Sequence, residues 1–443
     1  MTDLLAPAAT ALGGDVWPTR TLHRPDGATT VAGADLADLA ARFGTPLYIL
    51  DEAEFRDRCR AYRRALPHAD IAYAAKAFLS RAVAGWVRDE GLHLDVCSAG
   101  ELELAVTAGI PADRLILHGN AKPPAELAAA VRLGVGRIVL DNTGEIARLA
   151  ALVPAHDRQP VLLRLAPGIE AGAHRAIRTG GDDQKFGLPV TGGQALDAVS
   201  RVLAQPRLEL RGLHVHLGSQ ITSVRPFTAA VARLVDLMAH IRDRHGAVLP
   251  ELDLGGGHGI ACRPGEIPLD AADFAADVTR HLERECARHR LPVPHLTVEP
   301  GRALVGPAGV AVYRVLVVKR TPVRTFVAVD GGMSDNPRPA LYGARPALRL
   351  IGRPASRTLR PVTVVGRFCE AGDILAPDAE LPDDIRPGDL LAAPAAGAYQ
   401  MSMASTYNMV GRPPVVAVRG GEARVLLRRE TVADLLARDL GEE

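Results

Sequence analysis

A chain of 443 residues is longer than one ordinary domain and fits two, and its 47% apolar content can fill a large core. Its 52 basic and 51 acidic residues give a net charge of +1, and 4% of residues are aromatic, so the composition indicates no nucleic-acid partner. The five cysteines lack C-x-x-C spacing, and no apolar run reaches the ~18 residues that cross a bilayer. We therefore expect no metal site, no membrane contact and a cytoplasmic protein.

Between about residues 70 and 305, short apolar runs alternate with amphipathic stretches. A doubly wound open sheet has a similar pattern, but eight strands separated by helices favour a (β/α)8 barrel. The predicted strands are 70–75, 93–96, 115–117, 138–140, 161–165, 211–216, 250–254 and 295–298.

A ninth run, Leu47–Leu50, precedes these eight and does not fit the count. After about residue 306 the apolar runs become rich in β-branched residues with Gly and Pro between them, which is typical of short antiparallel strands. The sequence thus predicts two domains. Residues 46–305 form the barrel, and residues 306–443 together with 1–45 form a second, antiparallel β domain, sandwich- or barrel-like.

Lys76 follows the first predicted barrel strand in a chain with four lysines and 48 arginines. Arginine stays protonated, whereas a lysine amine can form a Schiff base with a carbonyl compound. An ordinary surface lysine is the alternative.

Active sites of (β/α)8 barrels lie at the C-terminal ends of the strands. Nearly every predicted strand here ends in a polar or glycine group, so we expect these groups to form one site. They are Lys76; Asp95, Cys97 and Ser98; His118 and Asn120; Asp141; Arg164; His216 and Ser219; Gly255, Gly256 and Gly257; and Glu299, Gly301 and Arg302.

Several of these groups have two interpretations. The glycines 255–257 either bind a phosphate through their backbone or form a tight barrel turn. Glu299 either pairs with Arg302 in a buried ion pair or holds a pyridinium N–H. His216 could stack on a flat ring, but His214 points the same way along the strand. His214 and His216 could also bind a metal ion, but the sequence shows no further Asp, Glu or Cys ligands at a recognisable spacing to complete such a site.

The second domain carries further candidates. Cys369 in Phe368-Cys-Glu370 is either a small hydrophobe or a proton donor. Tyr399 follows Gly397-Ala, and Arg338 and Tyr342 lie in a loop rich in Gly and Pro; these loops could also be simple turns.

Together these segments resemble the fold-type III pyridoxal-phosphate decarboxylases, and within them the diaminopimelate decarboxylase branch. The matching stretches extend over roughly residues 46 to 410, and Asn336–Tyr342 and Ser402–Asn408 point to that branch. The resemblance implies a barrel of the alanine-racemase type, pyridoxal 5'-phosphate as cofactor, a homodimer with shared active sites, and decarboxylation of meso-2,6-diaminopimelate to L-lysine, the last step of lysine biosynthesis. A related decarboxylase of another, possibly carrier-bound, amino acid and an amino-acid racemase are the alternatives.

The resemblance also implies a role for each residue. Lys76 binds the cofactor covalently beside Asp95, His216 stacks on its ring, and Glu299 pairs with the ring nitrogen. Arg302, Arg338, Tyr342, Glu370 and Tyr399 contact substrate, and Cys369 of the partner subunit returns a proton to the product. The cofactor phosphate is held by Ser219, the glycines 255–257, Gly301, Arg302 and Tyr399.

Three segments depart from the family pattern. Ala371 stands where serine is usual, Met401 where tyrosine is usual, and the loop 174–180 lacks a common Thr-His pair. These departures flank the substrate, so they concern the choice of substrate rather than the cofactor.

Overall fold

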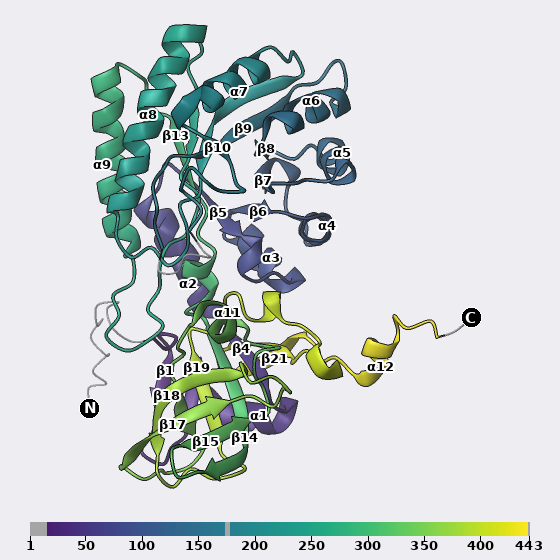
Figure 1. Ribbon diagram of the computed structural model, residues 1–443, viewed down its shortest axis with the longest axis vertical. Coiled ribbons are helices and arrows are strands. Elements are labelled where there is room, and N and C mark those ends of the chain that lie inside the picture. The colour runs from purple at the N-terminus through teal and green to yellow at the C-terminus, as the bar shows by residue number, and fades with distance from the viewer. Residues whose placement is uncertain (1–15, 173–177, 442–443) are drawn as a thin grey trace, which may run out of the picture.

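The computed structural model describes residues 16–172 and 178–441. Helices surround a parallel sheet in one unit, and a second unit of β strands lies against it (Figure 1). Residues 174–177 of the departing loop lie outside the described residues. Within the described ranges, no helix combines the length and the apolar character that crossing a membrane requires.

Eight parallel strands close into a barrel, which confirms the predicted fold and excludes the open sheet. The barrel closes because β8 pairs with β9, and because the last strand, β13, pairs with the first, β5. A two-residue strand, β10 (Leu188–Pro189), extends the sheet beside β9. The eight strands are β5 (Asp70–Ala74), β6 (His93–Val96), β7 (Leu115–Leu117), β8 (Arg137–Leu140), β9 (Gln159–Ala166), β11 (Leu208–Val215), β12 (Glu251–Asp253) and β13 (His295–Val298).

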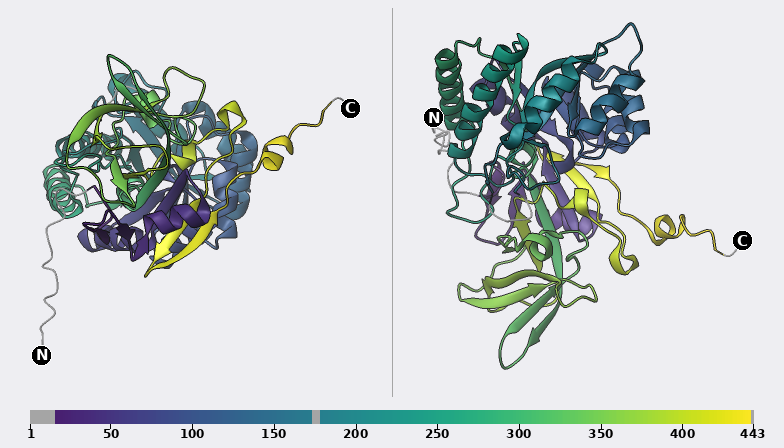
Figure 2. Two further views of the ribbon diagram at one scale, coloured as in Figure 1. Left: turned by 90° about the horizontal axis from the view of Figure 1, so that it is seen from below. Right: turned by 45° about the horizontal axis from the view of Figure 1, so that its top comes forward.

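Helices cover the outside of the barrel (Figures 1 and 2). Five of them begin with a side-chain cap. The side chains of Asp51, Ser80, Ser98, Asn142 and Asp270 accept a hydrogen bond from a backbone N–H of the first turn of α2, α3, α4, α6 and α9, respectively. Such caps fix where the chain leaves the sheet. The helices are α2 (Glu52–Ala65), α3 (Arg81–Asp89), α4 (Ala99–Thr107), α5 (Pro124–Leu133), α6 (Thr143–Leu152), α7 (Gln194–Leu203), α8 (Arg225–His245), α9 (Ala271–His289) and α10 (Arg302–Val305).

The second unit is built on a mixed, mostly antiparallel sheet. Two of its pairs, β15–β17 and β4–β20, are parallel, so the expectation of antiparallel strands was wrong for these pairs. The long β14 contacts β4 and β19 along its first half and β15 along its second, with a register shift near Val315. The strands are β4 (Leu47–Asp51), β14 (Gly309–Arg320), β15 (Thr325–Val329), β16 (Arg349–Ile351), β17 (Leu359–Val365), β18 (Ile374–Pro382), β19 (Leu390–Pro394), β20 (Val415–Arg419) and β21 (Glu422–Leu427).

The ninth run of the sequence, β4, pairs with β14 and β20 and therefore lies outside the barrel. Upstream of it, a small sheet of β1 (Thr21–His23), β2 (Thr29–Val31) and β3 (Ala34–Asp35) precedes α1 (Leu36–Phe43). Buried Leu36 and Leu39 of α1 share a core with Ile49 and Val310 of the second sheet. The domain limits 46–305 and 306–443 with 1–45 stay a prediction, and strand pairing groups residues 47–51 with the second sheet.

The C-terminal residues leave the body of the molecule as an extended arm that carries the short helix α12 (Val432–Leu436) (Figures 1 and 2). The side chains of Val432 and Leu436 are exposed on this arm.

One buried carboxyl group connects the second sheet to the loop before α11 (Arg338–Tyr342). Tyr48 of β4 donates a hydrogen bond to Asp335 Oδ2 at 3.0 Å, and its hydroxyl lies 3.1 Å from that of Tyr313 on β14. The Gly332 N–H donates to Asp335 Oδ1 at 2.8 Å. Burial, which these hydrogen bonds only partly offset, raises the pKa of Asp335 to about 7.

This raised pKa predicts that stability depends on Asp335. The folded protein keeps the Asp335 proton up to about pH 7, whereas the unfolded chain loses it near its ordinary pKa of 3.8. The unfolding free energy should therefore fall as pH rises from about 4 to about 7, by at most ~4 kcal/mol at ~1.4 kcal/mol per pKa unit. Asp335→Asn should flatten this part of the curve of melting temperature against pH, whereas the exposed control Asp378→Asn should leave it unchanged. An unaltered slope in Asp335→Asn would refute the buried, protonated state.

Candidate active site

A cavity of about 460 Å³ lies at the C-terminal ends of the barrel strands and includes side chains of the second unit. It brings together eight residues to which the resemblance assigned a role: Lys76, His216, Ser219, Glu299, Arg302, Arg338, Tyr342 and Tyr399. The individual roles of these residues stay predictions, but the structure brings them together from distant parts of the chain.

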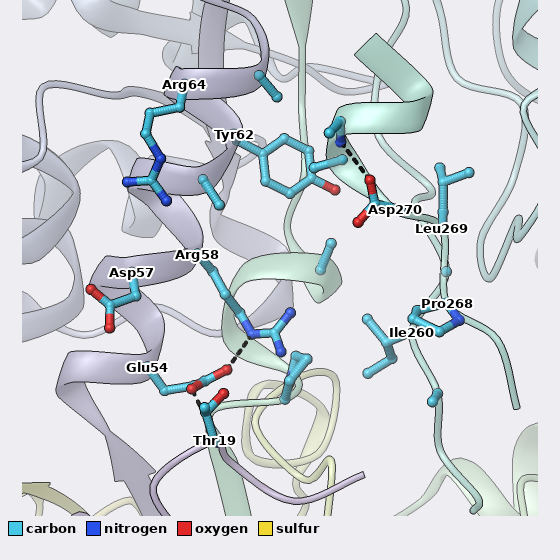
Figure 3. Close-up of a pocket in the computed structure, with 18 of the residues that line it drawn as sticks. Thr19, Glu54, Asp57, Arg58, Tyr62, Arg64, Ile260, Pro268, Leu269 and Asp270 are labelled. Atoms are coloured by element: carbon cyan, nitrogen blue, oxygen red, sulfur yellow. Dashed lines mark hydrogen bonds and ion pairs between the residues drawn. The ribbon is translucent and has the colours of Figure 1, made fainter. Parts of the chain in front are cut away.

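A larger cavity, of about 630 Å³, lies elsewhere, between α2 and residues 259–272 (Figure 3). Arg58 and Tyr62 of α2 point into it, and Arg58 Nε donates to Glu54 Oε1 at 2.7 Å. None of the described residues that line it is a lysine or a predicted site residue. The smaller cavity is therefore the candidate active site, because it holds the reactive groups.

Lys76 follows β5 and reaches into the smaller cavity. Its Nζ donates to Asp95 Oδ2 at 3.0 Å, and Asp95 lies on the neighbouring strand β6. Burial disfavours the ammonium, but the negative charge of Asp95 and the nearby Tyr399 and Glu299 outweigh burial and raise the pKa of Lys76 above its usual value. At neutral pH, Lys76 is therefore an ammonium ion paired with Asp95.

Lys122 shows what a structural lysine looks like in the same barrel. Its Nζ is fully buried and donates to Glu145 Oε2 at 2.8 Å and to two backbone carbonyls. All three of its hydrogens thus have partners, whereas Asp95 is the one acceptor of Lys76 Nζ among the described residues. This contrast favours the reactive interpretation of Lys76 over an ordinary lysine.

Glu299 lies at the end of β13, between two imidazoles. His214 Nε2 lies 3.3 Å from Oε2 and is placed to donate a hydrogen bond to it. His118 Nε2 lies 2.6 Å from Oε1, but without hydrogen-bond geometry, so Oε1 is buried without a hydrogen bond. The expected alternative of an ion pair with Arg302 is wrong, because the ion pairs of Glu299 within the described chain are with these histidines.

The ionisation of this cluster follows from its contacts. Burial opposes the charge of Glu299, but the two imidazoles offset it and hold the pKa of Glu299 well below its usual range. Burial lowers the pKa of His214 to about 4, so His214 is neutral at neutral pH. The ligand atoms of His118, His214 and Glu299 lie within 4.8 Å of one another, a spacing that a metal ion would also accept. The absence of a metal therefore stays a prediction.

His216 differs from His214 in its contacts, although both line the cavity. Its Nδ1 accepts a hydrogen bond from the Gly256 N–H at 3.2 Å, which leaves the proton of the neutral ring on Nε2. Burial, with the positive charges of Lys76 and Arg164, lowers the pKa of His216 well below its usual value. A neutral, fixed imidazole suits stacking on a flat ring.

The three glycines after β12 are required by close backbone packing. A Cβ at Gly256 would lie 2.1 Å from the Glu299 carbonyl oxygen, and one at Gly257 would lie 2.2 Å from that of Gly218. Gly255 and Gly257 also have φ angles of +65° and +90°. The tight-turn interpretation therefore accounts for these glycines, and a phosphate contact stays a prediction.

Arg302 stands beside Ser219 and Tyr399. Its guanidinium donates to Ser219 Oγ at 3.1 Å and lies 4.5 Å from the centre of the Tyr399 ring. Tyr399 is held close to the lysine segment, because its N–H donates to the Ala77 carbonyl at 2.8 Å. Burial and the charge of Arg338 lower the pKa of Arg302 to about 10, so it remains a cation at neutral pH.

Arg338 belongs to α11 and faces the same cavity from the second unit. Its guanidinium lies 5.9 Å from the centre of the Tyr342 ring. No carboxylate within residues 16–172 and 178–441 forms an ion pair with Arg302 or Arg338. Burial lowers the pKa of Arg338, as it does that of Arg302. A buried and a half-buried cation without a carboxylate partner are suited to bind anionic groups.

Cys369 and Glu370 do not line this cavity. Both lie exposed in the loop between β17 and β18, where the Cys369 N–H donates to Asn408 Oδ1 at 3.0 Å. Within one chain, therefore, these two predicted residues are not brought to Lys76.

The cavity residues fit pyridoxal 5'-phosphate. The buried Glu299 Oε1 has no hydrogen bond and would accept one from a ring N–H. Beside it lie a lysine amine for the aldehyde, a neutral imidazole for the ring face, and the Arg302 Nε, which is buried without a partner and suits a phosphate.

Comparisons with known proteins agree with this fit. Residues 52–306 match the pyridoxal-dependent decarboxylases in their pyridoxal binding domain, and the chain belongs to this family. A diaminopimelate decarboxylase of Actinosynnema pretiosum is 54% identical over 97% of this chain and 96% of its own length, and that of Mycobacterium tuberculosis H37Rv is 48% identical over 96% and 98%. Within the family, the chain groups with the diaminopimelate decarboxylases.

A solved structure gives the same result. The diaminopimelate decarboxylase of M. jannaschii in complex with L-lysine superposes with a TM-score of 0.89 at 30% identity, covering 96% of this chain and 98% of that one.

Some residues of the cavity were not assigned a role from the sequence. Cys97, His118, Asn120 and Arg164 were noted at strand ends, which was the available signal, but their contacts depend on how the barrel closes. Thr179, Phe186 and Met403 lie in loops with no such signal.

Lys76→Ala tests the covalent role of the lysine. The purified protein should be yellow, and the variant should bind pyridoxal 5'-phosphate without the visible band of the lysine-bound cofactor and lose turnover. Absorption spectra after cofactor titration measure this. Lys319→Ala, which removes an exposed lysine of β14, should keep the band. A full band in Lys76→Ala would rule out the assignment.

Proposed function

We propose that this protein uses pyridoxal 5'-phosphate to decarboxylate meso-2,6-diaminopimelate to L-lysine and carbon dioxide, the last step of lysine biosynthesis. The observation that carries the proposal is the pair of arginines without carboxylate partners in the Lys76 cavity, Arg302 buried and Arg338 half-buried. The cofactor phosphate and a second substrate carboxylate are two anions that need such cations. The identity to diaminopimelate decarboxylases supports this choice of substrate. The cytoplasmic location stays a prediction.

The chain's own groups have distinct tasks in this reaction. When bound, the cofactor supplies the electron sink for the carbon–carbon bond that breaks. Asp95 orients the Lys76 amine, and Glu299 holds the ring nitrogen in its protonated form. Arg302, with Ser219 and Tyr399 beside it, binds the phosphate.

The remaining tasks concern the substrate. Arg338 and Tyr342 bind its distal end, with the guanidinium paired to the second carboxylate. A thiol then returns a proton to Cα after carbon dioxide leaves, and we assign this step to Cys369.

The proton donor comes from a partner subunit in this proposal. Cys369 and Glu370 are exposed and lie outside the cavity of their own chain, which supports a homodimer whose loops complete each other's sites. The exposed Met409 and Tyr407 next to this loop would be covered in such a dimer.

Release of carbon dioxide from diaminopimelate by the holoenzyme is the direct test of the activity. Lysine and ornithine lack the distal carboxylate and should be poor substrates. If ornithine or a carrier-bound amino acid is turned over faster than diaminopimelate, the cofactor assignments stand and the substrate assignment is wrong.

Arg338→Ala tests the distal carboxylate contact. Removing one partner of a desolvated arginine–carboxylate pair costs about 2–5 kcal/mol, so kcat/KM for diaminopimelate should fall roughly 30- to 5,000-fold. The cofactor spectrum should not change. Arg345→Ala removes a more exposed arginine that follows the same helix and serves as the control. Equal losses in both variants would argue against a specific contact.

Subunit mixing tests the shared site. Lys76→Ala and Cys369→Ala should each be inactive, but a mixture that exchanges subunits should regain about a quarter of normal activity, because half of the dimers become hybrids with one intact site. Exchange is followed independently with a size tag on one variant. If exchange occurs and no activity returns, Cys369 does not act across the subunits.

A further inference from the structure

His118 lies between the two carboxylates that serve opposite ends of the cofactor in the proposed function. Its Nε2 is 2.6 Å from Glu299 Oε1 and 3.8 Å from Asp95 Oδ1. Glu299 is the acid assigned to the ring nitrogen, and Asp95 is the acid that holds Lys76. The imidazole is 5% exposed and lines the cavity.

The 2.6 Å contact constrains the protonation of His118. A bare imidazole nitrogen and a carboxylate oxygen repel each other at this distance, because both present lone pairs. Nε2 must therefore carry a hydrogen, which lies close to the Glu299 carboxylate although the contact lacks the angle of a hydrogen bond. The ring is also held in place, since it packs edge-on against His214 with 4.9 Å between ring centres.

The contact between His118 and Glu299 matters because it involves the one carboxylate oxygen of Glu299 that has no hydrogen bond. Its Oε2 already receives the hydrogen bond of His214, so Oε1 is the oxygen left for the cofactor ring. Asp253, on the neighbouring strand β12, makes no hydrogen bond to Glu299 within the described chain: its Oδ1 accepts from the Gly255 N–H at 2.8 Å, and its Oδ2 is buried without a partner. His118 is thus the group next to the free oxygen.

We infer that His118 is a positioning residue, which holds the Glu299 carboxylate in the orientation that keeps the cofactor ring nitrogen protonated. The inference rests on the proposed function for the role of Glu299. When a carboxylate and a pyridine share a proton, the proton stays on the nitrogen only if the carboxylate is the weaker base. The hydrogen that His118 presents stabilises the carboxylate charge and so weakens it as a base. Without His118, the proton moves toward Glu299 and the ring loses its positive charge.

The test uses holoenzyme loaded with cofactor that is labelled with ¹⁵N in the ring. In His118→Phe, which keeps a flat ring and removes Nε2, the nitrogen resonance should move from the pyridinium toward the neutral pyridine position. The kcat should fall about 10- to 100-fold, the loss that removing an orienting partner produces in metal sites, while KM changes little. His118→Gln, which restores an N–H donor, should recover the resonance and part of kcat.

A control separates this role from general disturbance of the loop. Ala121→Ser alters an exposed residue of the same loop, three positions on, which does not line the cavity, and should leave the resonance and kcat unchanged. The melting temperature and cofactor stoichiometry of each variant report folding. If His118→Phe fails to load cofactor, His118→Gln and His118→Asn are compared, and a neutral ring in the Asn variant alone supports the inference.

Three outcomes overturn it. A pyridinium resonance that is unchanged in His118→Phe shows that Glu299 keeps the ring nitrogen protonated without His118. A Gln variant as defective as the Phe variant shows that only ring packing matters. One metal ion per chain that is lost with His118 shows a metal site instead. If the ring-nitrogen resonance shifts in the variants as expected but the unmodified protein fails to decarboxylate diaminopimelate, the proposed substrate is refuted and the inference about His118 stands.

Discussion

The pairing of the last barrel strand with the first is the constraint on which the site depends. Because β13 lies beside β5, with Val298 opposite Ile71, the segment that carries Glu299 lies next to the segment that carries Lys76. These two residues come from opposite ends of the barrel sequence. In an open sheet with β5 and β13 at its two edges, the amine and the acid would be separated by the width of the sheet.

Closure of the barrel also buries several carboxyl groups, and these groups differ in protonation because their neighbours differ. Glu299 and Asp253 lie on adjacent strands and are both buried. Glu299 is flanked by two imidazoles and stays ionised, whereas Asp253 faces the charge of Glu299 and holds its proton. Asp95 is paired with the ammonium of Lys76. The contacts of each carboxyl, rather than its residue type, thus define its chemical role.

The second unit contributes what the barrel lacks. The barrel supplies the lysine and the acids, while α11 supplies Arg338 and the segment after β19 supplies Tyr399. Asp335 ties the loop before α11 to Tyr48 and thereby to both β4 and β14. Arg338, which we propose binds the second carboxylate of the substrate, is therefore held to the sheet through a buried hydrogen-bond network. The distance between Arg338 and Lys76 depends on how the two units pack.

The sequence by itself determined the eight barrel strands, the second β unit and the list of groups at the strand ends. This was possible because apolar runs bounded by Gly, Pro and polar residues are local signals, and a barrel places all strand ends on one face. The tertiary structure alone decided which groups touch. His214 and His216 have the same alternation and were indistinguishable in the sequence, but one contacts Glu299 and the other Gly256. Likewise, Glu299 meets imidazoles instead of Arg302, and β4 joins the second sheet through a parallel pair with β20. The physical reason is that a residue's periodicity fixes the face on which it lies, whereas its partners come from strands that only long-range closure makes neighbours.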